Sequence, residues 1–279
     1  MILVIGATAQ FGRQTVEALA AAGRPVRALT RNPQAAGLPE GVEVVRGDLT
    51  DTATLAPALE GVSELLLVLP YGLEAGPVLT EAQRAGVRQV VFLSSGAVVE
   101  GAVAQPDVIA AYHARVEEQI KASGLEWTFL RLMFPAINAL SWAMQLTSGD
   151  VVRGPYAGAS ASVVHEQDVA EAAAGVLGTS GHAGRAYELT GPQSLTQGEQ
   201  LAVLGGALGR ELSFEEVPDG PVRQQLSQFM DGDFINALLD LMAQTVGKPA
   251  AINDVVEQLT GHPARTFDQW AADHAADFS

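Results

Sequence analysis

The first twelve residues constrain the fold of this chain more than any other segment. Residues 1–5, MILVI, predict a buried strand, residues 6–12, GATAQFG, predict a loop, and a helical pattern follows. Gly6 allows a sharp turn where the strand ends, and Gly12 allows the helix to pack closely on the strand. The N–H groups at the start of such a helix are free to bind a pyrophosphate. The segment therefore predicts a dinucleotide-binding loop, formed by Gly6, Thr8, Ala9, Gln10, Phe11 and Gly12.

Two further observations bear on this loop. Ala9 stands where the middle glycine of a Gly-x-x-Gly-x-x-Gly spacing would allow the closest approach to a phosphate, so its methyl group is expected to weaken binding. An ordinary strand-to-helix turn also uses glycine, which is the alternative interpretation. A second strand at residues 25–30 completes a βαβ unit, however, and this context favours the nucleotide site.

Composition limits the possible partners. The 279 residues include 16 basic and 32 acidic side chains, a formal charge of −16 that repels nucleic acids and anionic membranes alike. No cysteine is present, which excludes disulfides, thiol catalysis and cysteine-based metal sites. No apolar stretch reaches about 18 residues, and the early first strand leaves no room for a signal peptide. We expect a cytoplasmic monomer or homodimer whose partner is a small-molecule substrate.

Short apolar runs alternate with amphipathic segments along the first half of the chain. We expect strands at residues 2–5, 26–29, 42–46, 64–69, 89–93 and 127–132, and helices near 14–22, 52–60, 78–85 and 108–123. Continuous apolar runs such as residues 65–69 are typical of strands that are buried on both faces of a parallel sheet. The pattern predicts an α/β protein with a Rossmann-type, doubly wound parallel sheet.

The second half of the chain has a looser pattern. We expect residues 1–155 to form the nucleotide-binding core, together with a helix and a strand from residues 163–190. Residues 156–279 are expected to form mainly a smaller, mostly helical substrate cap that is interleaved with the core.

The end of the second strand bears on the choice of cofactor. An NAD site usually has an acidic residue about 20 residues beyond the loop, whereas this chain has Arg31 in the turn at residues 30–33. A guanidinium can pair with a 2′-phosphate, so NADP(H) is favoured over NAD(H). A surface arginine in a turn is the alternative. Asp48 could accept from the adenine amino group or only cap a helix, and neighbouring Leu49 is included in the predicted cofactor site.

These segments together resemble the NmrA-like atypical short-chain dehydrogenase/reductases. The resemblance rests on residues 6–12, 30–33 (TRNP), 47–49 (GDL), 91–97 (VFLSSGA) and 117–131, and more weakly on 261–267. It implies an NADP(H)- or NAD(H)-binding protein. Some members of the family reduce quinones, azo dyes or related acceptors, and others only sense the redox state of the dinucleotide pool.

The same resemblance leaves the proton donor open. Better-known members of the superfamily use Tyr-x-x-x-Lys, but here Tyr112 is followed four residues later by Val116. Acid catalysis by a tyrosine therefore cannot be carried over. Hydride transfer between two flat rings needs mainly proximity and orientation, so solvent or a weak acid can supply the proton.

Three residues are the candidates for catalysis. Ser95, with its neighbour Ser94 in the cofactor site, lies at the carboxyl end of the fifth strand, where open sheets place ligands, although serine is also an ordinary turn residue. Tyr112 and His113 begin the helix that follows. A histidine has a pKa suited to proton donation near neutrality, and the alternative is a partly exposed helix residue.

Other candidates line the predicted pocket. The resemblance implies that residues after the sixth strand surround the nicotinamide, with Pro135 against the cofactor and Phe134 and Asn138 facing the substrate. Phe134 could equally be core. Pro70 is expected beside the cofactor and Tyr71 in the substrate pocket, although this turn could simply start a rigid loop.

Two groups in the second half have simpler interpretations. Asp168 is expected to cap the helix that begins near His165, and the five histidines lack the i, i+4 pairing of a helical metal site. No metal is predicted. Six apolar residues could shape a substrate pocket or pack internally: Phe229, Met230, Phe234, Leu238, Leu241 and Met242.

The sequence thus favours an NADP(H)-dependent oxidoreductase that transfers hydride to a small flat acceptor such as a quinone or a conjugated carbonyl. The alternatives are a redox-sensing regulatory protein without turnover and a non-redox biosynthetic enzyme, such as a cyclase, dehydratase or epimerase.

Overall fold

A seven-stranded parallel sheet forms the centre of the molecule. The computed structural model describes residues 1–278. The strands lie in the order β3-β2-β1-β4-β5-β6-β9, and every neighbouring pair runs parallel. Their bounds are Ile2–Ile5 (β1), Val26–Thr30 (β2), Glu43–Arg46 (β3), Glu64–Leu67 (β4), Gln89–Ser95 (β5), Glu126–Leu132 (β6) and Arg185–Leu189 (β9). The strand order reverses between β1 and β4, and ligands of open sheets bind beyond the carboxyl ends at such a point.

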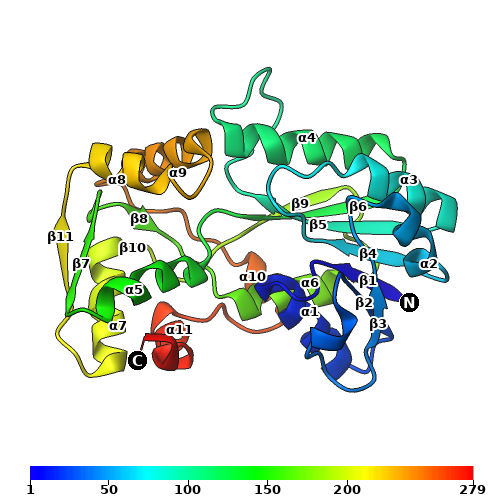
Figure 1. The fold of residues 1–279 in the computed structure, drawn as a ribbon, viewed down its shortest axis with the longest axis horizontal. Helices are drawn as coiled ribbons and strands as arrows, with labels where there is room; N and C mark the ends of the chain where they lie inside the picture. Colours follow the sequence, from blue (N-terminus) through cyan, green and yellow to red (C-terminus); the bar gives the residue numbers. More distant parts are fainter. Residues whose placement is uncertain (279) are drawn as a thin grey trace.

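Helices cover both faces of the sheet (Figure 1). One face carries α2 (Leu55–Leu59), α3 (Gly76–Ala85) and α4 (Val108–Ala122), and the other carries α1 (Gln10–Ala21), α6 (Glu166–Val176) and α10 (Val255–Thr260). Side chains of one strand alternate between the two apolar cores, so Leu65 and Leu67 enter the first and Leu66 the second. Burial on both faces explains why these strands are continuous apolar runs.

The predicted architecture is confirmed. All six predicted strands are present, although β4 ends at Leu67 and β5 continues to Ser95. The helix and strand expected after residue 163 are α6 and β9, and β9 pairs with β6 at the edge of the sheet. The chain therefore has the Rossmann-type, doubly wound fold.

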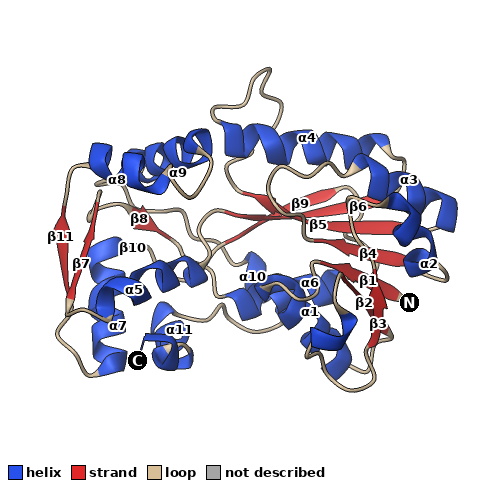
Figure 2. Ribbon diagram, in the orientation of Figure 1, coloured by secondary structure: helices blue, strands red, loops and turns tan. Residues whose placement is uncertain are grey.

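A smaller part of the chain lies beyond the carboxyl ends of the strands (Figure 2). Its helical segments are η3 (Ala136–Trp142), α5 (Ala143–Leu146), α7 (Gln197–Leu208), α8 (Asp219–Leu226), α9 (Gly232–Gln244), α11 (Phe267–Asp273) and η4 (Ala275–Phe278). Two short sheets, which the sequence pattern did not predict, join them. Strand β7 (Val151–Gly154) pairs in parallel with β11 (Ser213–Glu216), and β8 (Ser160–Ala161) pairs antiparallel with β10 (Leu195–Thr196).

This cap has an apolar core of its own. Leu201 and Leu204 of α7 are buried there with Trp142. The rings of Phe267 and Trp270 stack at 5.1 Å, so α11 is anchored against the cap by aromatic side chains. Two short 3₁₀ turns, η1 (Pro33–Ala35) and η2 (Thr52–Thr54), complete the elements. Within residues 1–278, no helix has the length and apolarity needed to cross a bilayer.

Candidate active site

The loop between β1 and α1 has the backbone geometry that its two glycines predict. Gly6 has a φ of +81°, a conformation that side chains disfavour. A Cβ atom on Gly12 would lie 2.2 Å from the carbonyl oxygen of Gly6, so only glycine fits there. The helix consequently begins directly against the end of the strand.

The first turn of α1 offers hydrogen-bond donors to a ligand. Ala9 is the N-cap and provides no side-chain acceptor, and the first intrahelical bond runs from the Arg13 N–H to the Ala9 carbonyl. The N–H groups of Gln10, Phe11 and Gly12 precede that bond and have no acceptor within residues 1–278. Thr8, Ala9 and Gln10 are exposed to solvent. The loop therefore fits the pyrophosphate of a dinucleotide.

Two guanidinium groups lie at the neighbouring ends of β2 and β3. Thr30 and Arg46 are partners in the register of these strands, and Arg31 follows Thr30. Both arginines are exposed, and neither forms an ion pair with any residue of the described chain. Both contribute to lowering the pKa of Asp48, after the larger effect of hydrogen bonds from Thr50. An exposed pair of unpaired cations at this position suits a phosphate.

Asp48 and Leu49 start the turn that follows β3. The Asp48 Oδ1 atom accepts from the Thr50 N–H at 2.9 Å and from its hydroxyl at 2.7 Å. Asp48 thus stabilises its own turn, and its second carboxylate oxygen has no partner within residues 1–278. Its predicted contact with adenine stays a prediction, as does that of half-buried Leu49.

The two serines at the end of β5 are engaged by the protein itself. The Ser94 hydroxyl donates to Glu117 at 2.7 Å, and the guanidinium of Arg131 donates to the same carboxylate at 2.9 and 2.6 Å. All three side chains are buried. The Ser95 hydroxyl accepts from the Ala97 N–H at 3.1 Å and so stabilises the following turn. The structure therefore gives both serines a local structural role.

Tyr112 binds the loop after β4. Its hydroxyl lies 3.0 Å from the carbonyl oxygen of Pro70 and 2.9 Å from that of Leu73, and it donates to them. Burial, followed by the charge of Glu74, raises the pKa of Tyr112 to about 12. The ring also contacts Tyr71 at 4.8 Å. Tyr112 thus holds the loop that carries Pro70 and Tyr71.

His113 is a residue of α4, and its ring packs against β5. Its Nδ1 atom is 2.8 Å from the carbonyl oxygen of Ile109 and must donate, because a carbonyl only accepts. Burial lowers the pKa of His113 below the usual value of 6.5, against the opposing effects of Ile109 and Glu117. The ring packs 6.2 Å from that of Phe92. At neutral pH the imidazole is therefore neutral, and its Nε2 atom is an acceptor.

A large apolar cavity opens between the sheet and the cap. It has a volume of about 420 Å³ and is lined by residues 134–142, by β8, by the start of α7 and by α9. Phe134, Pro135 and Asn138 are among its walls, as the sequence predicts for the pocket after β6. None of the described residues that line it has an ionisable side chain.

A second cavity of about 270 Å³ adjoins the first. Phe134, Ser160, Ala161 and Thr245 line both cavities, so the two compartments meet at these residues. The second compartment contains charged side chains, namely Arg131, Glu188 and Lys248. We call the first the apolar compartment and the second the polar compartment.

The structure brings only some of the predicted site residues to these compartments. The described residues that line them do not include Ser95, Tyr112 or His113. Tyr71 is 42% exposed and is not among the residues that line either compartment, although its ring lies 4.8 Å from that of Phe234, which lines the apolar one. Of the six apolar cap residues, Met230, Phe234, Leu238 and Met242 line the apolar compartment, Leu241 lines the polar one, and Phe229 is 80% exposed.

Sequence reasoning missed several lining residues. Gln197 and Gln200 begin α7, Ser160 lies on a two-residue strand, and Lys248 follows α9. None of them belongs to a motif, and short irregular segments have no periodic signal. The Thr196–Glu199 capping box before α7 is the one local signal that marks where this helix begins.

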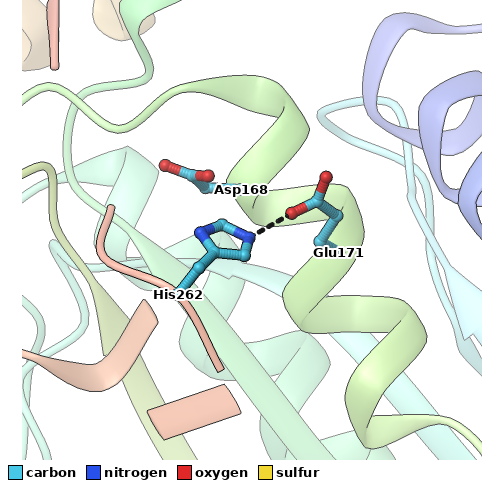
Figure 3. Close-up of side chains that lie close together, drawn as sticks. All are labelled: Asp168, Glu171 and His262. Carbon is cyan, nitrogen blue, oxygen red and sulfur yellow. Dashed lines mark hydrogen bonds and ion pairs between the residues drawn. The ribbon is translucent and has the colours of Figure 1, made fainter. Parts of the chain in front are cut away.

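A group of potential metal ligands lies elsewhere, where α6 meets the segment before α11. Figure 3 shows Asp168 and Glu171 of α6 beside His262, with nitrogen and oxygen atoms within 4.8 Å of one another. Arg265 enters the same group, since its guanidinium contacts Asp168 and donates to Glu171 at 3.1 and 2.9 Å. His262 Nε2 lies 2.6 Å from Glu171. Protein cations therefore neutralise these carboxylates and tie the segment to α6.

The predicted capping role of Asp168 is wrong. His165 is the N-cap residue of α6, and its Nδ1 atom accepts from the Gln167 N–H at 3.1 Å. Asp168 is completely buried, and its carboxylate accepts instead from the Arg265 N–H at 2.7 Å. A buried carboxylate requires such a partner, which lies 97 positions away in the sequence.

Comparison with known proteins agrees with the fold. The NmrA-like family model matches residues 1–271. A reductase of (4-alkanoyl-5-oxo-2,5-dihydrofuran-3-yl)methyl phosphate from Streptomyces griseus is 40% identical over 283 residues, covering 100% of this chain and 99% of the relative. An NAD(P)H azoreductase from Xenophilus azovorans is 32% identical over 100% and 99% of the two chains.

Among solved structures, an NADPH-dependent quinone oxidoreductase from Escherichia coli in complex with NADPH superimposes with a TM-score of 0.80. Its sequence is 27% identical, and the match covers 98% of this chain and 99% of the other.

Proposed function

The chain belongs to the NmrA-like family and is an oxidoreductase, and we propose that it uses NADP(H) as its cofactor. In this proposal, hydride passes to a small flat acceptor such as a quinone or a conjugated carbonyl. The observation that carries the proposal is the apolar compartment, whose described lining residues include no ionisable side chain. Its lining begins at Phe134, just beyond the carboxyl end of β6, and a nicotinamide would lie beyond the carboxyl ends of the strands in this fold.

The apolar compartment has no acidic side chain among its described lining residues, and this limits the acceptors that can be reduced there. Hydride addition to an isolated ketone leaves a strongly basic alkoxide, which needs a proton donor at the oxygen. Addition to a quinone or a conjugated carbonyl spreads the charge over the conjugated system, and water can protonate it afterwards. A wall of Phe134, Trp142 and Met242 binds and orients a flat ring without supplying a proton.

The cofactor would be held at three places. The loop at residues 6–12 and the first turn of α1 fit its pyrophosphate, and the residues from Phe134 to Asn138 would face its nicotinamide. When bound, the reduced nicotinamide supplies the hydride. Arg31 and Arg46 favour NADP(H) over NAD(H), because both are exposed and lack an ion-pair partner among residues 1–278.

The relatives support acceptors of this kind. The ring of a 5-oxo-2,5-dihydrofuran with a 4-alkanoyl group contains a double bond that is conjugated with two carbonyls, and this is the substrate class in the name of the 40% identical relative. The other two relatives are named for azo compounds and quinones, which are also flat and conjugated.

The test is NADPH oxidation with matched acceptors. Menadione and 2-cyclohexenone are compared with cyclohexanone, which has the same ring as the enone without the double bond. We expect turnover with the first two and rates at background with cyclohexanone. Tight NADPH binding without turnover of any acceptor would contradict the proposal and favour the redox-sensing function instead.

A further inference from the structure

The two compartments together fit a substrate that has one apolar arm and one polar arm. They share Phe134, Ser160, Ala161 and Thr245, so a planar group at this junction can extend into both. The larger compartment is walled by apolar residues of α9, among them Leu238, and fits a hydrocarbon chain. The smaller compartment is lined by charged side chains and therefore fits a polar arm.

Lys248 is the available cation of the polar compartment. Arg131 also lines it, but its guanidinium is already bound by Glu117 at 2.6 Å and by Glu100 at 2.7 Å. Lys248 has no ion pair or side-chain hydrogen bond with any residue from 1 to 278. Most of the other cations in this acidic chain have carboxylate or carbonyl partners, which makes an unpaired ammonium at a cavity unusual.

The backbone around Lys248 is fixed. The Lys248 N–H donates to the Thr245 carbonyl at 3.2 Å, and the Gly247 N–H donates to that of Gly158 at 3.4 Å. The Ala250 N–H donates to the Ser194 hydroxyl at 2.8 Å. The ammonium is therefore carried by a segment that is held at both sides, although the side chain itself is exposed.

Two serine hydroxyls add neutral donors to this compartment. Ser160 and Ser162 line it and are each only 8% exposed. Neither hydroxyl donates to or accepts from another side chain or backbone group within residues 1–278. Neither hydroxyl is among the fully enclosed polar atoms that lack a partner, so both are accessible to a ligand atom in the compartment. One ammonium and two hydroxyls together match the oxygens of a phosphate monoester.

We propose that the acceptor is an amphiphilic phosphate monoester, with its conjugated ring at the junction, its hydrocarbon arm in the apolar compartment and its phosphate on Lys248 in the polar compartment. The inference rests on the proposed function and deepens it. The 40% identical relative is named for a substrate with these three parts, an alkanoyl group, a conjugated ring and a methyl phosphate. Glu188 lines the same compartment and forms no ion pair with Lys248. Its negative charge is therefore expected to weaken the binding of a phosphate there.

The experiment compares (4-hexanoyl-5-oxo-2,5-dihydrofuran-3-yl)methyl phosphate with its dephosphorylated alcohol. The kcat/KM of each is measured by NADPH oxidation, and the readout is the ratio of the phosphate value to the alcohol value. We expect this ratio to be about ten or more in the wild type, to fall about tenfold in Lys248→Ala and to recover largely in Lys248→Arg, with the change in KM rather than kcat.

Two further variants sharpen the test. Arg185→Ala removes the same charge from an exposed position on β9 that lines neither compartment, and we expect it to leave the ratio unchanged. Glu188→Gln removes the opposing charge, so the ratio is expected to rise.

The outcomes separate this inference from the proposed function. Equal kcat/KM for the phosphate and the alcohol, or a ratio that Lys248→Ala leaves unchanged, would overturn the inference while the reduction of the alcohol and of menadione still supports the proposed function. If wild-type protein reduces none of the three acceptors, the proposed function fails and this inference fails with it.

Discussion

At the scale of single residues, the serine and tyrosine side chains that the sequence predicts as catalytic or cofactor-binding groups are already bound to other protein groups. The Ser94 hydroxyl donates to buried Glu117, the Ser95 hydroxyl accepts from a backbone N–H, and the Tyr112 hydroxyl donates to the loop after β4. These contacts give serine and tyrosine a structural reason to occur at these positions. Their catalytic roles stay predictions that mutation can test.

His113 provides the clearest test of this kind. Because burial lowers its pKa, the ring is neutral at pH 7, and its one N–H donates to the Ile109 carbonyl rather than toward the compartments. We expect His113→Gln to lower kcat with menadione by less than about threefold, whereas loss of a general acid typically costs about 100-fold or more. The dependence of kcat on pH between pH 5 and pH 8 should have the same shape in the wild type and in the variant. A loss of about 100-fold in kcat with unchanged NADPH affinity would establish His113 as the proton donor.

In the proposed function, Arg31 and Arg46 bind the 2′-phosphate of NADP(H). Each charge-assisted contact with a phosphate contributes about 1.5 to 3 kcal/mol, and NADH lacks that phosphate. We expect Arg31→Ala to raise the Kd for NADPH about tenfold or more and that for NADH less than twofold, with a smaller effect of the same kind from Arg46→Ala. Fluorescence titration with both cofactors measures this. Equal losses for NADPH and NADH would show that these arginines do not contact the 2′-phosphate.

At the scale of elements, the sequence predicts the sheet well and the cap poorly. A run such as Leu65–Leu67 is buried on both faces, and this burial is visible in the sequence as an unbroken apolar segment. Strand β8 has only two residues, and β7 (VVRG) and β11 (SFEE) have four residues each without a regular apolar–polar alternation. Their pairing depends on contacts between residues about 60 positions apart, which no local pattern reveals.

The same limit applies to the candidate site. Phe134, Pro135 and Asn138 could be predicted because they directly follow a recognisable strand and belong to a family motif. Lys248, Ser160 and Gln200 reach the compartments from separate elements of the cap, so only the tertiary structure brings them together. Arg265 likewise meets Asp168 across 97 positions, and an isolated acidic residue near a helix start resembles an ordinary cap.

The contact between α6 and the C-terminal helices predicts a pH dependence of stability. Glu166 is completely buried and accepts from Trp270 Nε1 at 3.0 Å and from His274 Nε2. Burial alone would lower the pKa of His274, but its hydrogen bonds with Asp277 and Glu166 outweigh burial and raise it above 6.5. The stabilisation is therefore complete below about pH 6.5 and is lost as the pH rises through the folded-state value.

We expect the difference in melting temperature between wild type and His274→Gln to be largest near pH 6 and to shrink by about pH 8.5. His182→Gln is the control, because burial lowers the pKa of His182 and gives no such trend. Differential scanning calorimetry across this range measures both variants. A difference that stays constant or grows with rising pH would show that protonated His274 does not stabilise the fold.

At the scale of the whole molecule, the distribution of charge agrees with anionic ligands. The chain carries a formal charge of −16, yet four cations have no ion-pair or hydrogen-bond partner for their side chains within residues 1–278: Arg31, Arg46, Arg185 and Lys248. Two of them lie at the predicted end of the cofactor that carries the 2′-phosphate, and one lies in the polar compartment. In a protein with a large negative net charge, phosphates are expected to bind where unpaired positive side chains are located.

The proposed reaction passes hydride to the β carbon of a conjugated acceptor and adds an exchangeable proton at its α carbon. The most direct measurement uses stereospecifically 4-deuterated NADPH, prepared as each of its two forms, with 2-cyclohexenone, and locates the label by mass spectrometry and NMR. We expect deuterium at the β carbon from one of the two forms, and, with unlabelled NADPH in D₂O, deuterium at the α carbon, because that hydrogen comes from an exchangeable proton and not from the cofactor. Deuterium at the carbonyl carbon, or no transfer from either form, would contradict it.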